Sequence, residues 1–575
     1  MMENFTRMQF LSGAGAAVAS GLFGGCRSLA RPAQGRRRVM DYWCTWETQV
    51  AFADRARRDP ANAGRDIRNS DMIDERLLFG KDGWAGLFPD ARQGLVLLLD
   101  AGWDYPYGTN RHADGGRGLA AYGSMRPDPV RFPSLTGSAV EKLTQLRRRV
   151  EDAGWGGLGL WVSPQKQGEW SGNRLPRAEL VEDMKRKLAE SQAAGVAYWK
   201  VDIGTHQGDV WYCQEMSRLA DIYAPDVVID HSCAFANPLN GVAHPHVYAK
   251  DVTGSARYVG KTGRMIGVPG FEPWPAGDPN ACDRHARMSV RELYTGLMRG
   301  ADSFRSYDTL YPMDAAAALE RAVFELQCAD SLGEACAVNV EDNPLIGAAL
   351  GVGIGVMRSA HNDEYPVAAP DPRRERLTEI ARTVRWRAFA PVFASDRGCP
   401  VRFSGRTAEE TWTFAPDSTW WAEAFGKSFF QRCPAVVARG LPLPDVASAA
   451  KETPIVAASR NPETGALSVA SLPFLTDGKG RHTPSAEITL DAALSPDAPL
   501  GVFGDCGAVV LRDGAAGRRI RARDLAGEAA HDITSLCRRE GGKVALPGDV
   551  LARIGRERNP SGDCSSPGVV VSVAG

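Results

Sequence analysis

The chain has 575 residues, of which 44% are hydrophobic and 24% are charged. This length and composition allow about two or three domains with substantial cores, and they exclude an intrinsically disordered chain. The formal net charge of -1 provides no electrostatic attraction for nucleic acid or for an anionic membrane surface. Neither is therefore expected as a partner.

The N-terminus is similar to a bacterial export signal. The run from Thr6 to Leu11 resembles a twin-arginine signal in which Met8 replaces the second arginine, and a weakly apolar stretch follows it. Leu22 to Cys26 resembles a lipoprotein cleavage box, so Cys26 is the expected site of a lipid anchor. These features predict an exported protein, periplasmic, cell-surface or secreted in a bacterium; the alternative is an unprocessed N-terminus.

Strand-like runs alternate with amphipathic, helix-like segments from residue 39 to about 310. The helix-like segments include Ala139 to Ala153, Ala178 to Ala193 and Arg287 to Arg299, where apolar residues recur at intervals of three and four. Alternation of this kind predicts right-handed crossovers and a parallel sheet, and eight such units close into a barrel. The eight expected strands are Val39 to Trp46, Leu95 to Asp100, Leu158 to Ser163, Ala197 to Ile203, Val227 to His231, His246 to Asp251, Met265 to Val268 and Ser303 to Ser306.

The fold class predicted from these patterns is α/β, a (β/α)8 TIM barrel followed by a C-terminal all-β domain. Residues 1–38 are assigned to the export signal and linker, and 39–335 to the barrel. Residues 336–400 are expected to form a connecting helical segment with an amphipathic helix from Arg374 to Phe393, although Gly351 to Gly355 is typical of a tight strand. In 401–575, short β-type runs separated by Gly, Pro, Asp and Asn predict the β-rich domain.

The run from Ala197 to Gly204 is chemically the most informative part of the chain. Alternate residues of a strand share a face, so Tyr198, Lys200 and Asp202 are expected to point together. Parallel α/β barrels build their active sites at the carboxyl ends of their strands. Lys200 and Asp202 are therefore candidate active-site residues; the alternative is a solvated ion pair beside a turn.

These strand ends resemble the clan of retaining α-glycosidases that includes the melibiase-type α-galactosidases, glycoside hydrolase families 27 and 36. In that clan a strand-end Lys-x-Asp carries the nucleophile, matched here by Lys200-Val201-Asp202. Asp100 to Trp103 matches a strand that ends in Asp-Asp-Gly-Trp, Asp41 to Trp46 matches a tryptophan-rich first strand, and Leu158 to Pro164 resembles the third strand. The resemblance covers roughly residues 39 to 310. It implies an α-galactosidase-like enzyme that acts on an oligosaccharide or glycan and needs no cofactor.

The resemblance also implies roles for individual residues. Retaining glycosidases need a carboxylate nucleophile and a second carboxyl group, about 5 Å away, that protonates the leaving oxygen. Asp202 fits the nucleophile and Asp251 is the first choice for the acid/base, with Asp230 second and Glu272 third; each of these is alternatively an ordinary strand-end carboxylate that binds a helix N-terminus. The residues expected to bind substrate are Trp46, Asp100, Trp103, Trp161, Lys200 and Asp230.

The sequence departs from the melibiase pattern at one position that bears on the substrate. Ala101 stands where that pattern has a second aspartate gripping galactose hydroxyls, and hydrogen bonds of this kind discriminate strongly between sugars. Galactose is therefore a first expectation, and Asp104 replaces the missing contact only if its loop folds back. The alternative function is a non-catalytic carbohydrate-binding protein on a degenerate glycosidase barrel.

Other motifs do not indicate a metal or nucleotide site. His244 and His246 lack a convincing third metal ligand. The run from Gly254 to Thr262 imitates a phosphate-binding loop but has the wrong spacing between its glycines. The chain has 12 cysteines, and an odd number remains once Cys26 is set aside, so an exported chain keeps at least one free thiol.

Overall fold

The computed structural model describes the chain from residue 39 onward, with gaps. The described residues are 39–109, 113–170, 172–206, 210–231, 247–250, 256–259, 303–306, 315–332, 337–358, 376–393, 399–404, 436–451, 454–476 and 480–574. The predicted export signal, with Cys26, lies outside them.

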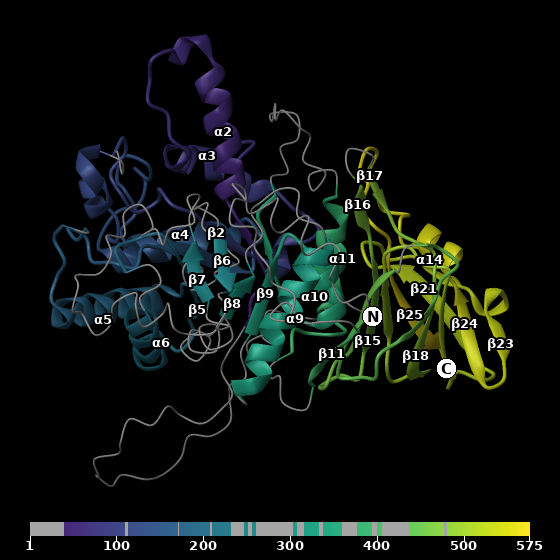
Figure 1. The fold of residues 1–575 in the computed structure, drawn as a ribbon. Coiled ribbons are helices and arrows are strands. Elements are labelled where there is room, and N and C mark those ends of the chain that lie inside the picture. Colours follow the sequence, from purple (N-terminus) through teal and green to yellow (C-terminus); the bar gives the residue numbers. More distant parts are fainter. Residues whose placement is uncertain are drawn as a thin grey trace, which may run out of the picture. The chain divides into compact units, whose positions relative to one another are not determined.

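The N-terminal part of the described chain is a TIM-barrel-like sheet of parallel strands (Figure 1). The strands form a closed barrel in the order β1-β10-β9-β8-β5-β4-β3-β2, and each neighbouring pair is parallel. Their bounds are β1 Tyr42–Cys44, β2 Val96–Leu99, β3 Gly157–Val162, β4 Tyr198–Val201, β5 Val228–His231, β8 Ser303–Ser306, β9 Ala337–Glu341 and β10 Gly353–Val356.

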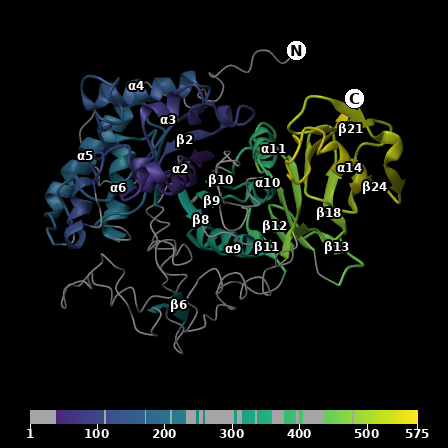
Figure 2. The ribbon, with the colours of Figure 1, turned by 90° about the horizontal axis from the view of Figure 1, so that it is seen from above.

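Helices α4 (Ala139–Asp152), α5 (Arg177–Ala194) and α6 (Val210–Tyr223) follow strands of this sheet (Figure 2). Local signals set their ends: Ser138 and Glu141 form a capping box at the start of α4, and Gly195 adopts the left-handed conformation that ends α5. Apolar residues of the helices share one core with the outward-facing residues of the strands: Leu143, Leu146, Leu180, Met184, Leu188, Leu97, Leu158, Leu160, Trp199 and Val201.

Most of the other helical elements are short, and α2 and α9 are the longer ones. The helices are α2 Trp46–Arg58, α3 Glu75–Phe79, α9 Ala315–Leu332, α10 Pro344–Leu350, α11 Thr378–Trp386 and α14 Gly548–Ile554. The 3₁₀ segments are Pro60–Asn62, Asn69–Asp71, Trp84–Gly86, Arg92–Gly94, Ala113–Ala121 and Thr534–Leu536. Within the described residues, no helix has the length and apolar character that a membrane span requires.

Two of the eight expected barrel strands are not among the barrel strands that the structure describes. The expected barrel strand at His246 to Asp251 is wrong, because β6 (Val247–Lys250) pairs antiparallel with β7 (Ala256–Val259) in a separate two-stranded sheet. The connection between them is too short for the crossover that parallel pairing requires. The expected strand at Met265 to Val268 lies outside the described residues.

The segment expected to connect the domains through helices contributes two strands to the barrel, β9 and β10. The tight strand predicted at Gly351 to Gly355 is present as β10. Its glycines allow close packing: a Cβ added to Gly355 would lie 2.3 Å from the Tyr42 hydroxyl. The amphipathic helix predicted for this segment is also present, as the shorter helix α11.

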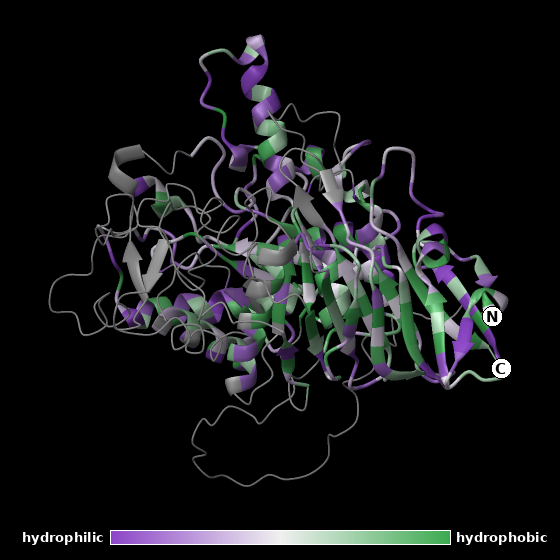
Figure 3. Cartoon of the chain, turned by 45° about the vertical axis from the view of Figure 1, so that its right-hand side comes forward, coloured by the Kyte–Doolittle hydropathy of each residue, from purple (hydrophilic) through white to green (hydrophobic). Residues whose placement is uncertain are grey.

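The β-rich C-terminal domain is present as predicted. One eight-stranded sheet has the order β11-β12-β14-β15-β19-β25-β21-β22, and a five-stranded sheet has the order β13-β18-β20-β24-β23. Buried residues alternate with more exposed ones along β18 (Glu487–Leu494), as in a strand with one face on a core. Hydrophobic residues are concentrated on the strands (Figure 3).

The remaining strands of this domain are listed by their bounds. They are β11 Val401–Phe403, β12 Val436–Arg439, β13 Asp445–Ala447, β14 Ile455–Arg460, β15 Leu467–Leu472, β19 Leu500–Phe503, β20 Ala508–Asp513, β21 Arg519–Asp524, β22 Ala530–Asp532, β23 Arg538–Glu540, β24 Lys543–Pro547 and β25 Gly568–Ala574. A separate hairpin pairs β16 (Phe474–Thr476) with β17 (Gly480–His482).

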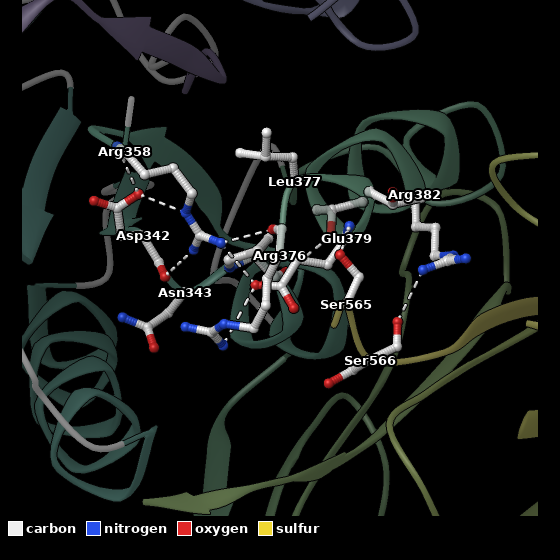
Figure 4. A network of polar contacts seen from close by, with 12 residues as sticks. Asp342, Asn343, Arg358, Arg376, Leu377, Glu379, Arg382, Ser565 and Ser566 are labelled. Carbon is white, nitrogen blue, oxygen red and sulfur yellow. Dashed lines mark hydrogen bonds and ion pairs between the residues drawn. The ribbon is translucent and has the colours of Figure 1, made fainter. Parts of the chain in front are cut away.

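Buried ion pairs join helix α11 to its neighbours on both sides. Figure 4 shows the Arg358 contacts with Asp342 and Glu379 and a hydrogen bond from Arg382 to the Ser566 carbonyl oxygen. Arg358 donates to Asp342 at 3.2 Å and to Glu379 of α11 at 2.9 Å. One turn further along α11, Arg382 makes a bidentate contact with Asp524 at the end of β21, with both distances 2.9 Å. Because paired buried charges satisfy one another, α11 can carry these groups in an interior position.

Candidate active site

Three charged side chains meet at the carboxyl ends of β2 and β4. The Lys200 ammonium lies 2.6 Å from Asp100 Oδ2 and 3.6 Å from Asp202 Oδ2. The side chains of Lys200 and Asp100 are 1% and 4% exposed, whereas that of Asp202 is 16% exposed. Lys200 therefore links a buried carboxylate to a more accessible one.

Asp100 is held by contacts to both of its oxygens. Oδ1 accepts a hydrogen bond from the Ala101 amide at 2.7 Å, and Oδ2 accepts one from the Cys44 thiol at 3.0 Å. The Asp100 amide in turn donates to Thr45 Oγ1 at 2.9 Å. Burial, together with the Asp100 carboxylate, raises the pKa of Cys44 well above its usual value. Cys44 is therefore a neutral thiol donor, a role that its sequence context did not suggest.

A second polar layer lies deeper in the barrel interior. The Tyr198 hydroxyl donates to Asp230 Oδ2 at 2.7 Å, and the Tyr42 hydroxyl donates to Glu341 Oε1 at 2.9 Å. The two tyrosine rings are 5.3 Å apart. Sequence reasoning missed Tyr42 and Glu341, because they are brought together only when β1 and β9 enter the same barrel.

Asp230, the second choice for the acid/base, belongs to this deeper layer. It is 0% exposed and lies beside Lys200 in the register of β4 and β5. Because Asp202 is two residues beyond Lys200, Asp230 lies one interior layer below the candidate nucleophile. The structure places Asp230 level with Lys200 and buried, rather than at the more accessible end where Asp202 lies.

The predicted substrate-binding tryptophans separate into two environments. Trp161 belongs to an aromatic cluster with Ala101, Tyr105 and Tyr122, and the partly buried Trp46 packs against it. The Tyr122 and Trp161 ring centroids are 5.3 Å apart. We refer to Trp46, Tyr105, Tyr122 and Trp161 as the aromatic cluster. Nothing in the spacing of Tyr105 and Tyr122 along the chain indicated that they would join it.

Trp103 lies elsewhere, in the core between strands and helices. It is 0% exposed, and its indole N–H donates to the Trp161 carbonyl oxygen at 2.9 Å. The turn before it depends on Gly102, whose φ of +124° is unfavourable for other residues; an added Cβ would lie 2.1 Å from the Ser70 carbonyl oxygen. Trp103 therefore holds the loop after β2 against β3 through packing and one hydrogen bond.

Asp104 follows Trp103 and is also buried. Its Oδ2 accepts a hydrogen bond from the Met125 amide at 3.1 Å, and Lys187 of α5 is one of the charges acting on it. Burial raises the pKa of Asp104 to about 6. The Asp104 carboxylate thus contacts the loop that contains Met125, and the side chain is buried rather than turned toward the site as a second aspartate.

The other acid/base candidates lie outside the described residues. Asp251 directly follows β6, and Glu272 and the two histidines, His244 and His246, fall in the same undescribed part of the chain. Within the described residues, no group of three or more His, Cys, Asp or Glu side chains is arranged to hold a metal ion.

No family model matches the chain, and no curated protein matches it in sequence. A glycoside hydrolase family 27 β-L-arabinopyranosidase from Geobacillus stearothermophilus, solved in complex with arabinose, is 12% identical with a TM-score of 0.34, over 88% of this chain and 94% of its own. An α-amylase from Anoxybacillus is 9% identical with a TM-score of 0.33, over 84% and 88% of the two chains. Similarities at this level carry no argument about activity.

Proposed function

We propose that the protein is a retaining glycoside hydrolase in which Asp202 is the nucleophile. The observation that carries the proposal is the Asp100–Lys200–Asp202 group at the carboxyl end of a parallel barrel. Of its two carboxylates, Asp202 is the more accessible, while Asp100 is buried and accepts hydrogen bonds from three donors: the Cys44 thiol, the Ala101 amide and the Lys200 ammonium. The group thus offers one carboxylate for attack and keeps the other in place as a fixed countercharge.

The proposed reaction is a double displacement. An Asp202 carboxylate oxygen attacks the anomeric carbon as the glycosidic C–O bond breaks, and the acid/base carboxyl, for which we propose Asp251, protonates the leaving oxygen. Water, deprotonated by the same acid/base, then attacks the anomeric carbon and releases Asp202. Lys200 stabilises the Asp202 carboxylate before attack and again when it leaves.

We further propose an exported enzyme for terminal α-linked sugars, with α-galactosides as the first substrates to test. The aromatic cluster lies beside Ala101; its Tyr105, Tyr122 and Trp161 rings are buried, so the partly buried Trp46 is the member that we propose packs on a sugar ring. Ala101 itself cannot donate or accept through its side chain, so the preference among sugars is expected to differ from that of an enzyme with two aspartates there. Export, with Cys26 as lipid anchor, follows from the similarity of the N-terminus to a signal sequence.

The test is hydrolysis of aryl α-galactoside, α-N-acetylgalactosaminide, α-glucoside and β-L-arabinopyranoside by the wild type and by Asp202→Asn. Asp54→Asn is the matched control, because Asp54 is a partly exposed residue of α2 that pairs with its near neighbour Arg57. We expect wild type and control to release the aryl group with retention at the anomeric carbon, and Asp202→Asn to be inactive but folded. Activity in Asp202→Asn would refute the assignment. Saturable sugar binding by a wild type without turnover would favour the carbohydrate-binding alternative.

A further inference from the structure

The loop that follows Asp202 is tied to the loop that follows β3. The Ser163 hydroxyl donates to the Ile203 carbonyl oxygen at 2.8 Å, and the His206 amide donates to the Pro164 carbonyl oxygen at 3.0 Å. Between these two contacts, the amide and the hydroxyl of Thr205 both donate to Gln165 Oε1, each at 3.0 Å. The backbone beyond the candidate nucleophile is thus held from one side at three successive points.

Gln165 connects this loop to a third one. Its side-chain amide nitrogen donates to the carbonyl oxygens of Leu119 at 2.6 Å, Tyr122 at 3.4 Å and Glu169 at 3.2 Å. The Gln165 side chain is buried, and the backbone carbonyl oxygen of Gln165 accepts a hydrogen bond from Lys187 Nζ at 2.6 Å. One buried amide therefore bridges the loops after β2, β3 and β4.

The chemistry of this position requires an amide. The nitrogen faces carbonyl acceptors and the oxygen faces the donors of Thr205, so a carboxylate would lose the donor side and an apolar side chain would lose both. Leaving such buried groups without partners is unfavourable. Tyr122, whose carbonyl is one of the acceptors, is a member of the aromatic cluster. Gln165 thus joins the Asp202 loop to the aromatic cluster through hydrogen bonds.

We propose that Gln165 is a positioning residue that sets the Asp202 carboxylate relative to the aromatic cluster and hence to the anomeric carbon of a bound sugar. The proposal rests on the function proposed above. Small displacements of a reacting group lower the rate of attack much more than they weaken binding, because the substrate contacts are left in place. Loss of the Gln165 bridge is therefore expected to slow attack by Asp202 while sugar binding changes little.

A second tie holds the same loop through the side chain of Glu169, whose backbone carbonyl oxygen is one of the Gln165 acceptors. His206 Nε2 lies 3.0 Å from Glu169 Oε1, and both residues are buried. The Glu169 carboxylate also accepts hydrogen bonds from the amides of Leu175 and Lys166, at 3.1 and 3.3 Å. We therefore expect the loop to stay attached when Gln165 is changed, and the Gln165 variants to fold.

The experiment measures the first chemical step directly. A 5-fluoro-glycosyl fluoride of the sugar that the enzyme accepts is attacked at its anomeric carbon by the Asp202 carboxylate, which expels fluoride and leaves a slowly hydrolysed glycosyl ester. Mass spectrometry of the full-length protein gives the maximal labelling rate and the concentration for half-maximal rate. The variants are Gln165→Met, Thr205→Val and Thr205→Ser. The matched control is Gln192→Met, because Gln192 also uses its amide to bond a loop, through Asp226, but lies at the opposite end of α5 from the loops after β3 and β4.

Thr205→Val is expected to lower the maximal labelling rate about tenfold, because one hydrogen bond that positions the reacting group is lost. The concentration for half-maximal rate is expected to change little. Gln165→Met should lower it further, and Thr205→Ser, which keeps the hydroxyl, should restore the wild-type rate. Equal labelling rates in wild type, Gln165→Met and Thr205→Val would overturn the role of Gln165 while leaving the proposed function intact. If Gln165→Met does not fold, the comparison of Thr205→Val with Thr205→Ser tests the role of Gln165 by itself. A wild type that is not labelled with any sugar of the panel would overturn the proposed function, and the role of Gln165 with it.

Discussion

The buried carboxyl group of Asp104 makes the stability of the barrel depend on pH. Burial raises its pKa from the ordinary value of 3.8 to about 6, against the opposing effect of the Met125 amide. Above pH 6 the group is ionised in both the folded and the unfolded chain, and a difference of about 2 pKa units costs the folded state about 3 kcal/mol. As the pH falls from about 6 toward 4, the folded state takes up the proton first and this penalty disappears.

The perturbation is Asp104→Asn, which removes the charge and keeps an oxygen for the Met125 amide. We expect the variant to be more stable than the wild type at pH 7.5 by about 1 to 3 kcal/mol, because the new amide N–H groups themselves need acceptors. The advantage should shrink steadily below pH 6 and be gone near pH 4. Urea unfolding followed by tryptophan fluorescence at a series of pH values measures it, with Asp54→Asn as a control that should show no such trend. A difference between Asp104→Asn and wild type that stays constant from pH 4 to 7.5 would refute the reasoning.

Three further predictions concern the buried contacts. Cys44→Val should lower the free energy of unfolding by about 1 to 3 kcal/mol, because Asp100 loses a buried donor, whereas Cys44→Ser should retain most of it; thermal unfolding of both variants checks this. Arg382→Met should cost about 3 to 5 kcal/mol in denaturant unfolding by leaving the Asp524 carboxylate buried without its partner, and Arg382→Met combined with Asp524→Leu should recover much of the loss. Trp103→Phe should lower the melting temperature but leave the KM for an aryl glycoside unchanged, since this indole packs in the core; a raised KM at unchanged stability would place it in the binding site instead.

The sequence alone determined those features that depend on neighbours along the chain. The capping pair Ser138 and Glu141 and the left-handed Gly195 set helix ends through contacts within a few residues. The alternation around Lys200 placed it on the same strand face as Asp202, and the two side chains are 3.6 Å apart. Short β-type runs separated by Gly, Pro, Asp and Asn likewise predicted a β-rich C-terminal domain, because these turn residues end strands locally.

Tertiary structure decided which distant segments meet. Tyr42 donates a hydrogen bond to Glu341, and Cys44 donates one to Asp100, because the barrel brings together strands that are far apart in the chain. The period of a run shows that it is a strand but does not specify its partner, so β6 pairs with β7 outside the barrel while β9 and β10 enter it. Trp103 is a further example. The sequence of a strand-end tryptophan is the same whether its ring packs in the core or faces a substrate, and in this fold the Trp103 ring packs in the core.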